Sequence, residues 1–260
     1  MSLDDLVHDD IPVNQPYEGL IAEAYDVWMP PYGDDADVEI YRRAIEHNAG
    51  PALELGCGTG RLLLGYARAG YDVEGVDASA DMLAICAAHA RAGGFEVTLH
   101  HADWLTLDLD RTFATIYNPA GSFSLIASDD DARTALAAWR RHLRPGGEIV
   151  IPMGVPTADF GTNYEWRLRR SATRERDGVT FMVQEAVKVD TDAQVQHILN
   201  RHEVWAADGT LVTTFMRRHR LRYWTRDQFE GLLRDSGFEG VQSFGADDEF
   251  LVVGFAPAAS

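Results

Sequence analysis

Short apolar runs alternate with amphipathic helical stretches between residues 52 and 152. The apolar runs are too short for buried helices and are bounded by Gly, Pro or Asp, which favours strands. Strands that alternate with helices predict a mostly parallel sheet with helices on both faces. The expected strands are 52–55, 71–76, 95–100, 112–117 and 149–152, and the expected helices include 61–69 and 129–142.

The pattern changes to a period of two between residues 164 and 224. Apolar and polar positions alternate there, and Asp177-Gly178 and Asp208-Gly209 are strong hairpin-turn signals. These features predict a four-stranded antiparallel meander inserted after the fifth strand. The elements expected after it are a helix at 226–236 and strands at 238–244 and 250–256, which complete a seven-stranded, doubly wound α/β sheet.

The residues before the first strand have a different character. Residues 1 to about 15 are polar and acidic and predict a mobile tail. Two amphipathic stretches, 17–28 and 37–47, predict short helices that lie over a ligand site as a lid. The expected parts of the chain are 1–50 (tail and lid helices), 51–152 (ligand-binding core), 153–224 (antiparallel insertion that caps a substrate pocket or forms a dimer interface) and 225–260 (elements that complete the sheet).

Composition narrows the functional classes. The 260 residues carry a formal net charge of −18, which disfavours nonspecific binding to nucleic acid or to an anionic membrane. No apolar run approaches the roughly 20 residues of a membrane-spanning helix, and the acidic amino terminus lacks a signal-peptide pattern, so a cytoplasmic location is expected. The two cysteines, Cys57 and Cys86, form no metal-ligand cluster. We therefore expect no nucleic-acid, membrane or metal partner.

The most informative stretch joins the first strand to the first helix after it and reads E-L-G-C-G-T-G from Glu54 to Gly60. Glycine accepts positive φ and lets a ligand approach the backbone, and a strand that turns into a helix presents free N–H groups and the positive end of the helix dipole. Open α/β sheets bind ligands at such strand ends. The third glycine comes one position too early for the dinucleotide pattern G-x-G-x-x-G, and Glu54 suits an ammonium group better than a pyrophosphate.

The E-L-G-C-G-T-G string resembles the first motif of the class I S-adenosylmethionine-dependent methyltransferases, of the small-molecule, methyltransferase domain 25-like type. L-R-P-G-G at 143–147, G-F at 237–238 and F-L-V-V-G-F at 250–255 are also similar to that family. The resemblance covers about residues 17–256 and implies a Rossmann-like fold with S-adenosylmethionine as cofactor. It also implies a bacterial enzyme of secondary metabolism that methylates an O or N atom of a small molecule by in-line displacement.

Residues at the ends of the next strands complete the expected cofactor site. Asp77 ends the second strand, where an acid accepts both ribose hydroxyls of this cofactor or of a nicotinamide cofactor. Met82 fits a contact with adenine and equally fits an ordinary core methionine. The resemblance implies that Asp103 meets the adenine amino group and favours a contact of Arg61 with the cofactor carboxylate over a role at the surface. The full expected set is Tyr17, Tyr25, Trp28, Glu54, Gly56, Cys57, Gly58, Arg61, Asp77, Ala78, Met82, Ala102, Asp103, Trp104, Asn118 and Phe123.

Methyl transfer from a sulfonium depends on positioning, because the positive charge disappears as the carbon moves. The expected catalytic residues are Tyr25, Tyr117 and Asn118; Tyr25 lies in A-x-x-Y-D, which resembles the amino-terminal helix of small-molecule methyltransferases. The aromatic residues of that helix equally fit ordinary anchors on the core, and Asn118 equally fits a turn cap. A base is needed only for a protonated acceptor. Candidates on the meander, each of which also fits a structural role, are Tyr164, Glu185, His197, His202 and Tyr223.

Several alternatives stay open at this point. The meander arginines Arg167, Arg201, Arg217 and Arg220 can receive an acidic group on the substrate or form a solvated sheet face. An enzyme that uses S-adenosylmethionine without methylating, for instance by cyclising its aminobutyryl chain, has the same motif. A noncatalytic cofactor-binding protein and a nicotinamide dehydrogenase are further interpretations, and the insertion also suits a homodimer interface.

Overall fold

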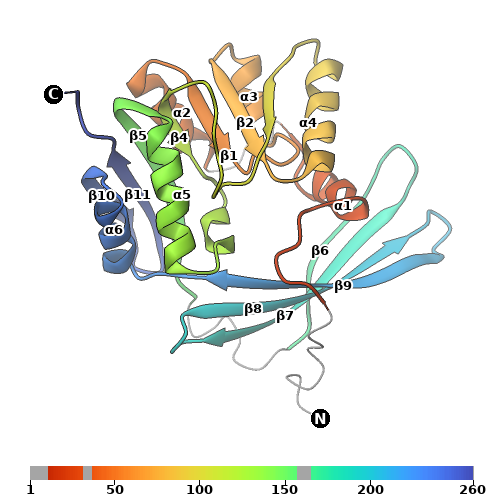
Figure 1. The fold of residues 1–260 in the computed structure, drawn as a ribbon. Coiled ribbons are helices and arrows are strands. Elements are labelled where there is room, and N and C mark those ends of the chain that lie inside the picture. The colour runs from red at the N-terminus through yellow and green to blue at the C-terminus, as the bar shows by residue number, and fades with distance from the viewer. Residues whose placement is uncertain (1–10, 32–36, 157–164, 260) are drawn as a thin grey trace.

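A computed structural model describes residues 11–31, 37–156 and 165–259. It contains a seven-stranded sheet flanked by helices and a separate four-stranded sheet beneath it (Figure 1). In the part of the chain that is described, no helix is long and apolar enough to cross a membrane. The predicted α/β class with an antiparallel insertion is confirmed.

The seven-stranded sheet has the order β10-β11-β5-β4-β1-β2-β3. Strands β1 to β5 pair in parallel, whereas β11 pairs antiparallel with both β5 and β10. Chain order reverses at β1, so the carboxyl ends of β1 and β4 flank a switch point of the kind where open sheets bind ligands. The strands are β1 (Ala52–Leu55), β2 (Val73–Asp77), β3 (Thr98–His101), β4 (Phe113–Tyr117), β5 (Leu143–Gly154), β10 (Glu239–Gly245) and β11 (Glu249–Phe255).

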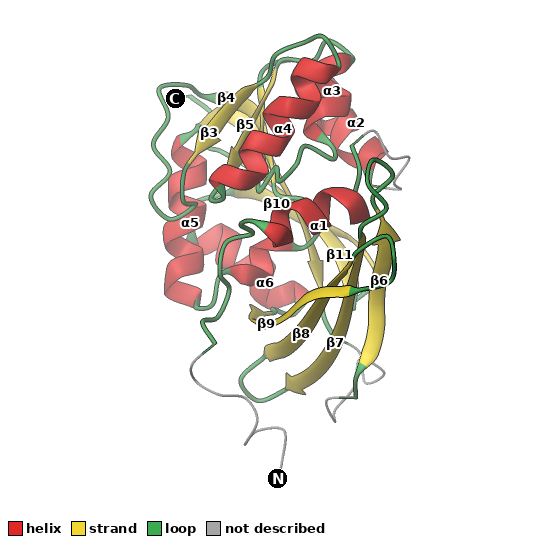
Figure 2. Cartoon of the chain, turned by 90° about the vertical axis from the view of Figure 1, so that its right-hand side faces the viewer, coloured by secondary structure: helices red, strands yellow, loops and turns green. Residues whose placement is uncertain are grey.

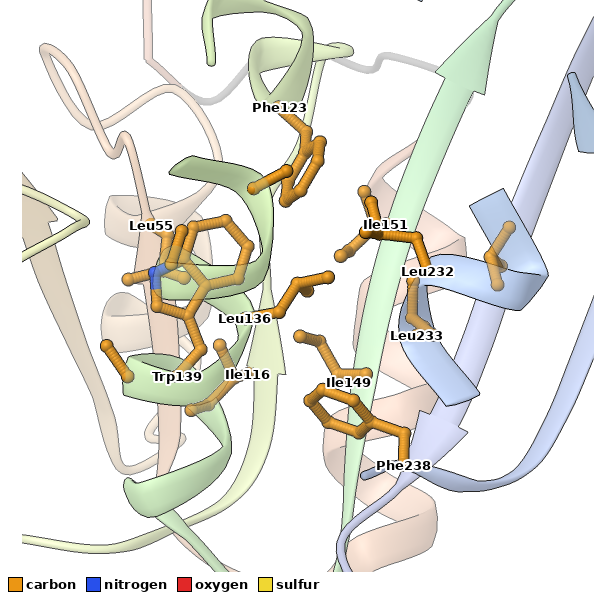
Figure 3. Close-up of a cluster of buried hydrophobic side chains, with 14 of the residues drawn as sticks. Leu55, Ile116, Phe123, Leu136, Trp139, Ile149, Ile151, Leu232, Leu233 and Phe238 are labelled. Carbon is orange, nitrogen blue, oxygen red and sulfur yellow. The ribbon is translucent and has the colours of Figure 1, made fainter. Parts of the chain in front are cut away.

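Helices cover both faces of this sheet. On one face α5 and α6 bury side chains such as Trp139, Leu136 and Leu233 against Ile149 and Ile151 of β5 (Figure 3). On the other face α2, α3 and α4 pack over β1, β2 and β4. The helices are α1 (Leu20–Trp28), α2 (Val38–Asn48), α3 (Leu63–Arg68), α4 (Ala80–Ala92), α5 (Asp129–Arg141) and α6 (Arg226–Asp235), with a 3-10 turn η2 (Ser122–Leu125) after β4.

Side-chain caps fix where three helices begin. The hydroxyl of Ser79 accepts from the amide of Met82 at the start of α4, and Ser128 caps α5 in the same way. Thr225 and Gln228 form a capping box on α6.

The fifth strand begins earlier than the predicted range of 149–152. Strand β5 already begins at Leu143, and its pairing with β4 shifts register between Phe113 and Thr115, so the intervening residues bulge out. Gly146 has a φ of 72°, which glycine adopts without the steric cost that a side chain brings. Proline and glycine therefore form a bulge within the strand.

The antiparallel insertion lies between β5 and α6 and forms a sheet of order β6-β7-β8-β9. Its hairpin turns fall at Asp177-Gly178 and Asp208-Gly209, as predicted, and both glycines have positive φ. Helix α1 packs on one face of this sheet through Ala24 and Trp28, and it also contacts α4 (Figure 2). The strands are β6 (Arg167–Thr173), β7 (Thr180–Asp190), β8 (Val195–Trp205) and β9 (Leu211–Arg222).

The predicted mobile tail is wrong for residues 11–15; residues 1–10 lie outside the described part of the chain. Val13 forms a parallel bridge with Arg218, and the amide of Asn14 donates to the Arg218 carbonyl at 3.1 Å. The segment is ordered because it adds to the edge of β9, a partner about 200 residues away that leaves no local signal in the sequence.

Candidate active site

A cavity of about 620 Å3 opens at the carboxyl ends of β1 and β2. It is lined by segments that are far apart in sequence: residues 13–17, α1, the glycine turn, residues 77–82, residues 103–105, residues 122–127, Asp131 of α5 and Arg220 of β9. Its walls are Val13, Asn14, Gln15, Pro16, Tyr17, Tyr25, Gly56, Gly58, Asp77, Ala78, Ser79, Met82, Asp103, Trp104, Leu105, Ser122, Leu125, Ile126, Ala127, Asp131 and Arg220.

The glycine turn forms the floor of this cavity. Gly56 and Cys57 both donate to the Val76 carbonyl, at 2.8 and 3.0 Å, which ties the turn to β2. Gly56 and Gly58 have φ values of 75° and 54°. A Cβ on Gly56 would come within 2.9 Å of the Trp104 ring, and one on Gly58 would extend toward Tyr25. Positive φ therefore favours glycine at both positions, and at Gly56 the Trp104 ring also leaves no space for a side chain.

The side chain of Asp77 is held by two backbone amides, one from the glycine turn and one from the start of α4. Its carboxylate oxygens accept from the amides of Gly58 and Ser79, each at 2.9 Å. Burial raises the pKa of Asp77, and these two hydrogen bonds oppose that shift. Each carboxylate oxygen has a second lone pair. The side chain can therefore accept further hydrogen bonds from a diol in the cavity.

Aromatic residues and Met82 enclose the cavity from above and from the side. The rings of Tyr17 and Tyr25 meet edge to face with centroids 5.7 Å apart. Burial raises the pKa of Tyr25 to about 12, so its hydroxyl is neutral. The indole nitrogen of Trp104 is buried and has no hydrogen-bond partner in the described part of the chain. The walls thus combine flat apolar surfaces with an unused donor, which fits a nucleoside.

Asn118 ties two strand ends together at the switch point. It is fully buried, and its Nδ2 donates to the Leu55 carbonyl at 2.7 Å. Its Oδ1 has no partner among the described residues. Nδ2 of Asn118 lies 3.8 Å from the position that a Cβ on Gly56 would take. The unpaired Oδ1 of the same amide group therefore lies close to the cavity floor.

Glu54 and Tyr117 form a buried pair beneath the turn. Tyr117 is 0% exposed; its hydroxyl donates to Glu54 at 3.0 Å, and its ring stacks on Tyr41. Burial raises the pKa of Glu54 to about 8. The expectation that Tyr117 faces the transferred methyl group is wrong, because the last residue of β4 points to the face that α2 covers.

Three other expected cofactor residues contact other parts of the protein. Trp28 turns to the insertion, where its Nε1 donates to the Phe181 carbonyl at 3.2 Å. Phe123 is buried in the core, with its ring 5.0 Å from that of Phe229. Cys57 is buried under the turn, where its sulfur would be 2.7 Å from a Cβ on Gly75. For Trp28 the alternative role as a core anchor is the one that the structure shows.

Arg61 forms a two-bonded ion pair with Asp37, at 2.7 and 2.9 Å. It lines a second cavity instead of the first. Ala78, Asp103 and the neighbour Trp104 line the first cavity as expected, whereas Ala102 packs against the core.

The candidate bases on the insertion do not gather at the first cavity. His202 is stacked between Trp28 and Phe215, and burial lowers its pKa to about 4, which suits a neutral structural role. Glu185 lies 3.5 Å from Arg169 in an ion pair. Neither His197 nor Tyr223 lines the cavity, and Tyr164 lies outside the described residues.

The second cavity, of about 890 Å3, lies beside the carboxyl ends of β4 and β5. The two cavities adjoin across one loop and one helix. Gly121 lines the second and Ser122 the first; Tyr25 of α1 lines the first, and Met29, the residue after α1, lines the second. The second cavity is lined by Met29, Asp37, Ile40, Tyr41, Arg61, Ala120, Gly121, Pro152, Met153, Gly154, Val155, Pro156, Gln196, Phe244, Asp248, Glu249, Phe250 and Leu251.

Sequence reasoning missed the wall that residues 13–16 build. It named Arg220 only as an arginine for an acidic group on the substrate, whereas Arg220 lines the first cavity together with these residues. The only available signal was the polarity of Asn14 and Gln15, which also suits a solvent-exposed tail. Ser122 and Asp131 were missed because they lie on η2 and α5, outside the motifs.

Comparisons with known proteins agree with this geometry. A family model described as "Methyltransferase domain" matches residues 52–147, the stretch from β1 into β5. A dTDP-3-amino-3,6-dideoxy-alpha-D-glucopyranose N,N-dimethyltransferase of Streptomyces fradiae is 29% identical over 226 residues, which are 85% of this chain and 84% of that protein. A glycine/sarcosine N-methyltransferase of Parasynechococcus marenigrum is 26% identical over 81% of this chain and 71% of its own length.

Solved structures share the whole architecture. DesVI of Streptomyces venezuelae superposes with a TM-score of 0.73 at 21% identity, covering 93% of this chain and all of its own. The CcbJ methyltransferase of Streptomyces caelestis has a TM-score of 0.69 at 25% identity, covering 92% and 96% of the two chains. The likeness therefore includes the antiparallel insertion. With the glycine turn and the fixed Asp77, these matches identify residues 52–147 as a methyltransferase domain and the protein as a small-molecule methyltransferase of the S-adenosylmethionine-dependent kind.

Proposed function

We propose that this enzyme methylates the amino nitrogen of an amino-deoxy sugar carried on a nucleotide. The observation that carries the proposal is a cavity of about 620 Å3, lined by Asp77, Met82 and aromatic residues, with a second cavity of about 890 Å3 near it at the switch point of the sheet. The Streptomyces fradiae relative, named for such a substrate, matches along most of both chains. Its name supports the substrate class, and the O-acceptor and non-methylating alternatives find no comparable support.

In the first cavity we place S-adenosylmethionine, which supplies a methyl group on a positively charged sulfur. Asp77 accepts the two ribose hydroxyls, and Trp104 and Met82 flank the adenine. Tyr17 and Tyr25 close the cavity and exclude water, which strengthens the electrostatic interactions inside it. Glu54, beneath the turn, becomes charged when the amino-acid end of the cofactor brings an ammonium group near it.

In the second cavity we place the acceptor. Asp248 and Glu249 on the rim of this cavity attract an amine, whereas the charge of Asp37 is balanced by its ion pair with Arg61; Tyr41 and Phe250 supply apolar surface for the sugar and base. The attacking amine must be neutral, so a carboxylate on this rim takes its proton. The phosphates of a nucleotide would be the acidic group predicted for the substrate. The homodimer and the cytoplasmic location stay predictions.

The test is a product analysis by mass spectrometry. Purified protein is incubated with S-adenosylmethionine and dTDP-3-amino-3,6-dideoxy-α-D-glucopyranose, and separately with the 3-hydroxy counterpart of that sugar. We expect the amino sugar to gain the mass of one and then two methylene groups and the hydroxy sugar to gain none. Methylation of the hydroxy sugar alone would contradict an amine acceptor, and release of methylthioadenosine without methylation would contradict methyl transfer.

A further inference from the structure

Residues 13–19, called the strap from here on, run from the edge of β9 to the start of α4 and form one wall of the first cavity. Tyr17 is the residue of the strap whose ring faces Tyr25 across this wall. The strap precedes the methyltransferase domain, and its partner β9 follows that domain in sequence. It therefore connects the insertion to the cofactor cavity.

Asn14 attaches the strap to β9 with its side chain as well as its backbone. The backbone amide donates to the Arg218 carbonyl at 3.1 Å. The side-chain Nδ2 donates to the Arg220 carbonyl at 2.9 Å, and Oδ1 accepts from the Arg220 amide at 3.0 Å. The side-chain amide of Asn14 thus pairs with the backbone of β9 as the peptide group of a neighbouring strand would. Nδ2 also donates to the Leu125 carbonyl at 3.1 Å, so Asn14 joins the strap to η2 on the cavity wall.

Arg217 holds the next residues from the neighbouring position of β9. It is 5% exposed and donates to the carbonyls of Gln15 and Pro16. Its guanidinium lies 4.5 Å from the centroid of the Tyr17 ring. A buried cation is costly unless its donors are satisfied, so this contact favours one conformation of the strap. The opposite end is tied to α4, where Ser79 donates to the Tyr17 carbonyl and Gly19 donates to Asp81 at 2.6 Å.

We propose that Asn14 and Arg217 are positioning residues for the cofactor: from β9 they hold the strap so that Tyr17 closes the cavity that Asp77 and the glycine turn form. This inference rests on the proposed placement of S-adenosylmethionine in that cavity. Neither residue needs to touch the cofactor. The insertion thereby contributes to donor binding as well as to the acceptor site.

The test measures the affinity for S-adenosylhomocysteine by titration calorimetry. We expect Arg217→Met to weaken binding by about tenfold, because the strap loses two hydrogen bonds and its cation contact. Asn14→Asp keeps the size of the side chain but removes both Nδ2 hydrogen bonds, so it should weaken binding to a similar degree. The matched control is Arg201→Met, the same change at an exposed arginine of β8 that lies on the other face of the inserted sheet from Arg217. This variant should bind like wild type.

A double-mutant cycle separates positioning from general destabilisation. Tyr17→Ala should weaken binding by about tenfold, since it removes a buried aromatic wall. If Arg217 acts through the strap, Tyr17→Ala/Arg217→Met should bind no worse than Tyr17→Ala alone. A loss in the double variant equal to the product of the two single losses, about a hundredfold, would overturn the proposal. So would wild-type affinity in Arg217→Met. If Arg217→Met does not fold, Asn14→Asp decides: wild-type affinity in that variant would overturn the proposal, and weakened binding would support it.

One further variant distinguishes this inference from the proposed function. Asp77→Ala should weaken binding by more than tenfold, through the loss of paired hydroxyl contacts. If Asp77→Ala binds normally, the placement of the cofactor is wrong. If Asp77→Ala loses affinity while Arg217→Met and Asn14→Asp do not, the cofactor is placed correctly and only the positioning role fails.

Discussion

At the scale of single residues, the site depends on positions where a side chain would occupy the space of a ligand. Gly58 shows this most clearly, since its backbone requires positive φ and the nearest atoms to a Cβ, on Tyr25 and Met82, lie 3.7 and 3.9 Å away. The free protein therefore has room for a small side chain there, but a ligand on the turn and that side chain would compete for the same volume.

We expect Gly58→Val to abolish binding of S-adenosylhomocysteine in calorimetry while a folded protein remains. The matched control is Gly70→Val, because Gly70 has a φ of 89° and no atom within 4 Å of its Cβ position. Both variants carry the strain of a branched residue at positive φ. If the two variants bind equally well, the turn does not contact the ligand.

Glu54 predicts a pH dependence of stability. Burial raises its pKa to about 8 in the folded protein, against 4.5 for a free glutamate. The folded state then binds the proton more tightly, so the stability linked to Glu54 is full below about pH 4.5 and is lost as the pH rises toward 8. We expect cofactor-free Glu54→Gln to melt higher than wild type at about pH 9 and alike at about pH 4.5, since a tenfold difference in proton affinity between the two states corresponds to about 1.4 kcal/mol. A difference that is constant with pH would contradict this account.

At the scale of elements, α4 links helix capping to the cofactor cavity. Ser79 caps this helix, lines the cavity and holds the strap through the Tyr17 carbonyl. Ser128 caps α5 by the same contact but does not line the cavity. The two serines therefore share one structural role and differ in the other.

Ser79→Ala and Ser128→Ala should each lower the free energy of unfolding by about 1 kcal/mol, the usual cost of a lost cap. For a chain of this length that is a fall in melting temperature of about 2–4 °C. Only Ser79→Ala should weaken S-adenosylhomocysteine binding. Equal affinity in both variants would show that the hydroxyl of Ser79 does not position the strap.

The elements themselves were largely predictable from the sequence. The apolar run of β1 lies between a proline and the glycine turn, and the alternation in β7 and β8 fixes which residues share a face. The direction of Tyr117 was not predictable, because β4 is buried on both faces and carries no alternation of apolar and polar residues. Phe123 lies on the short 3-10 turn η2, whose four residues are too few to show a periodic pattern. Asp77 and Trp104, which were predicted as cofactor residues, line the first cavity because Asp77 ends β2 and Trp104 lies in the loop that follows β3.

At the scale of the whole molecule, the first cavity is built from segments that are far apart in sequence and that a ligand must order together. The strap could not be predicted, because its contacts with β9 connect positions more than 200 residues apart. The motif around Gly56 predicted the floor of the cavity. The roof, which the strap and Tyr25 form, depends on tertiary packing. Ligand binding should therefore slow hydrogen exchange in segments that are far from the motif in sequence.

Hydrogen exchange followed by mass spectrometry tests this expectation. We expect S-adenosylhomocysteine to slow exchange at residues 13–17, 56–60, 77–82 and 103–105 together, and to leave the exposed edge strand β6 unchanged. At about a hundred times its dissociation constant the ligand should also add about 2.7 kcal/mol of stability. Protection confined to the glycine turn would show that the strap and the strand ends do not enclose the ligand.

The pairing of the strap with β9 bears on how such enzymes can be recombined. An engineer who exchanges the antiparallel sheet for that of another enzyme, in order to change the acceptor, also replaces the surface on which residues 11–29 rest. The donor cavity would then lose its roof, even though every residue of the glycine motif had been kept. A chimaera should therefore inherit its first thirty or so residues and its inserted sheet from the same parent.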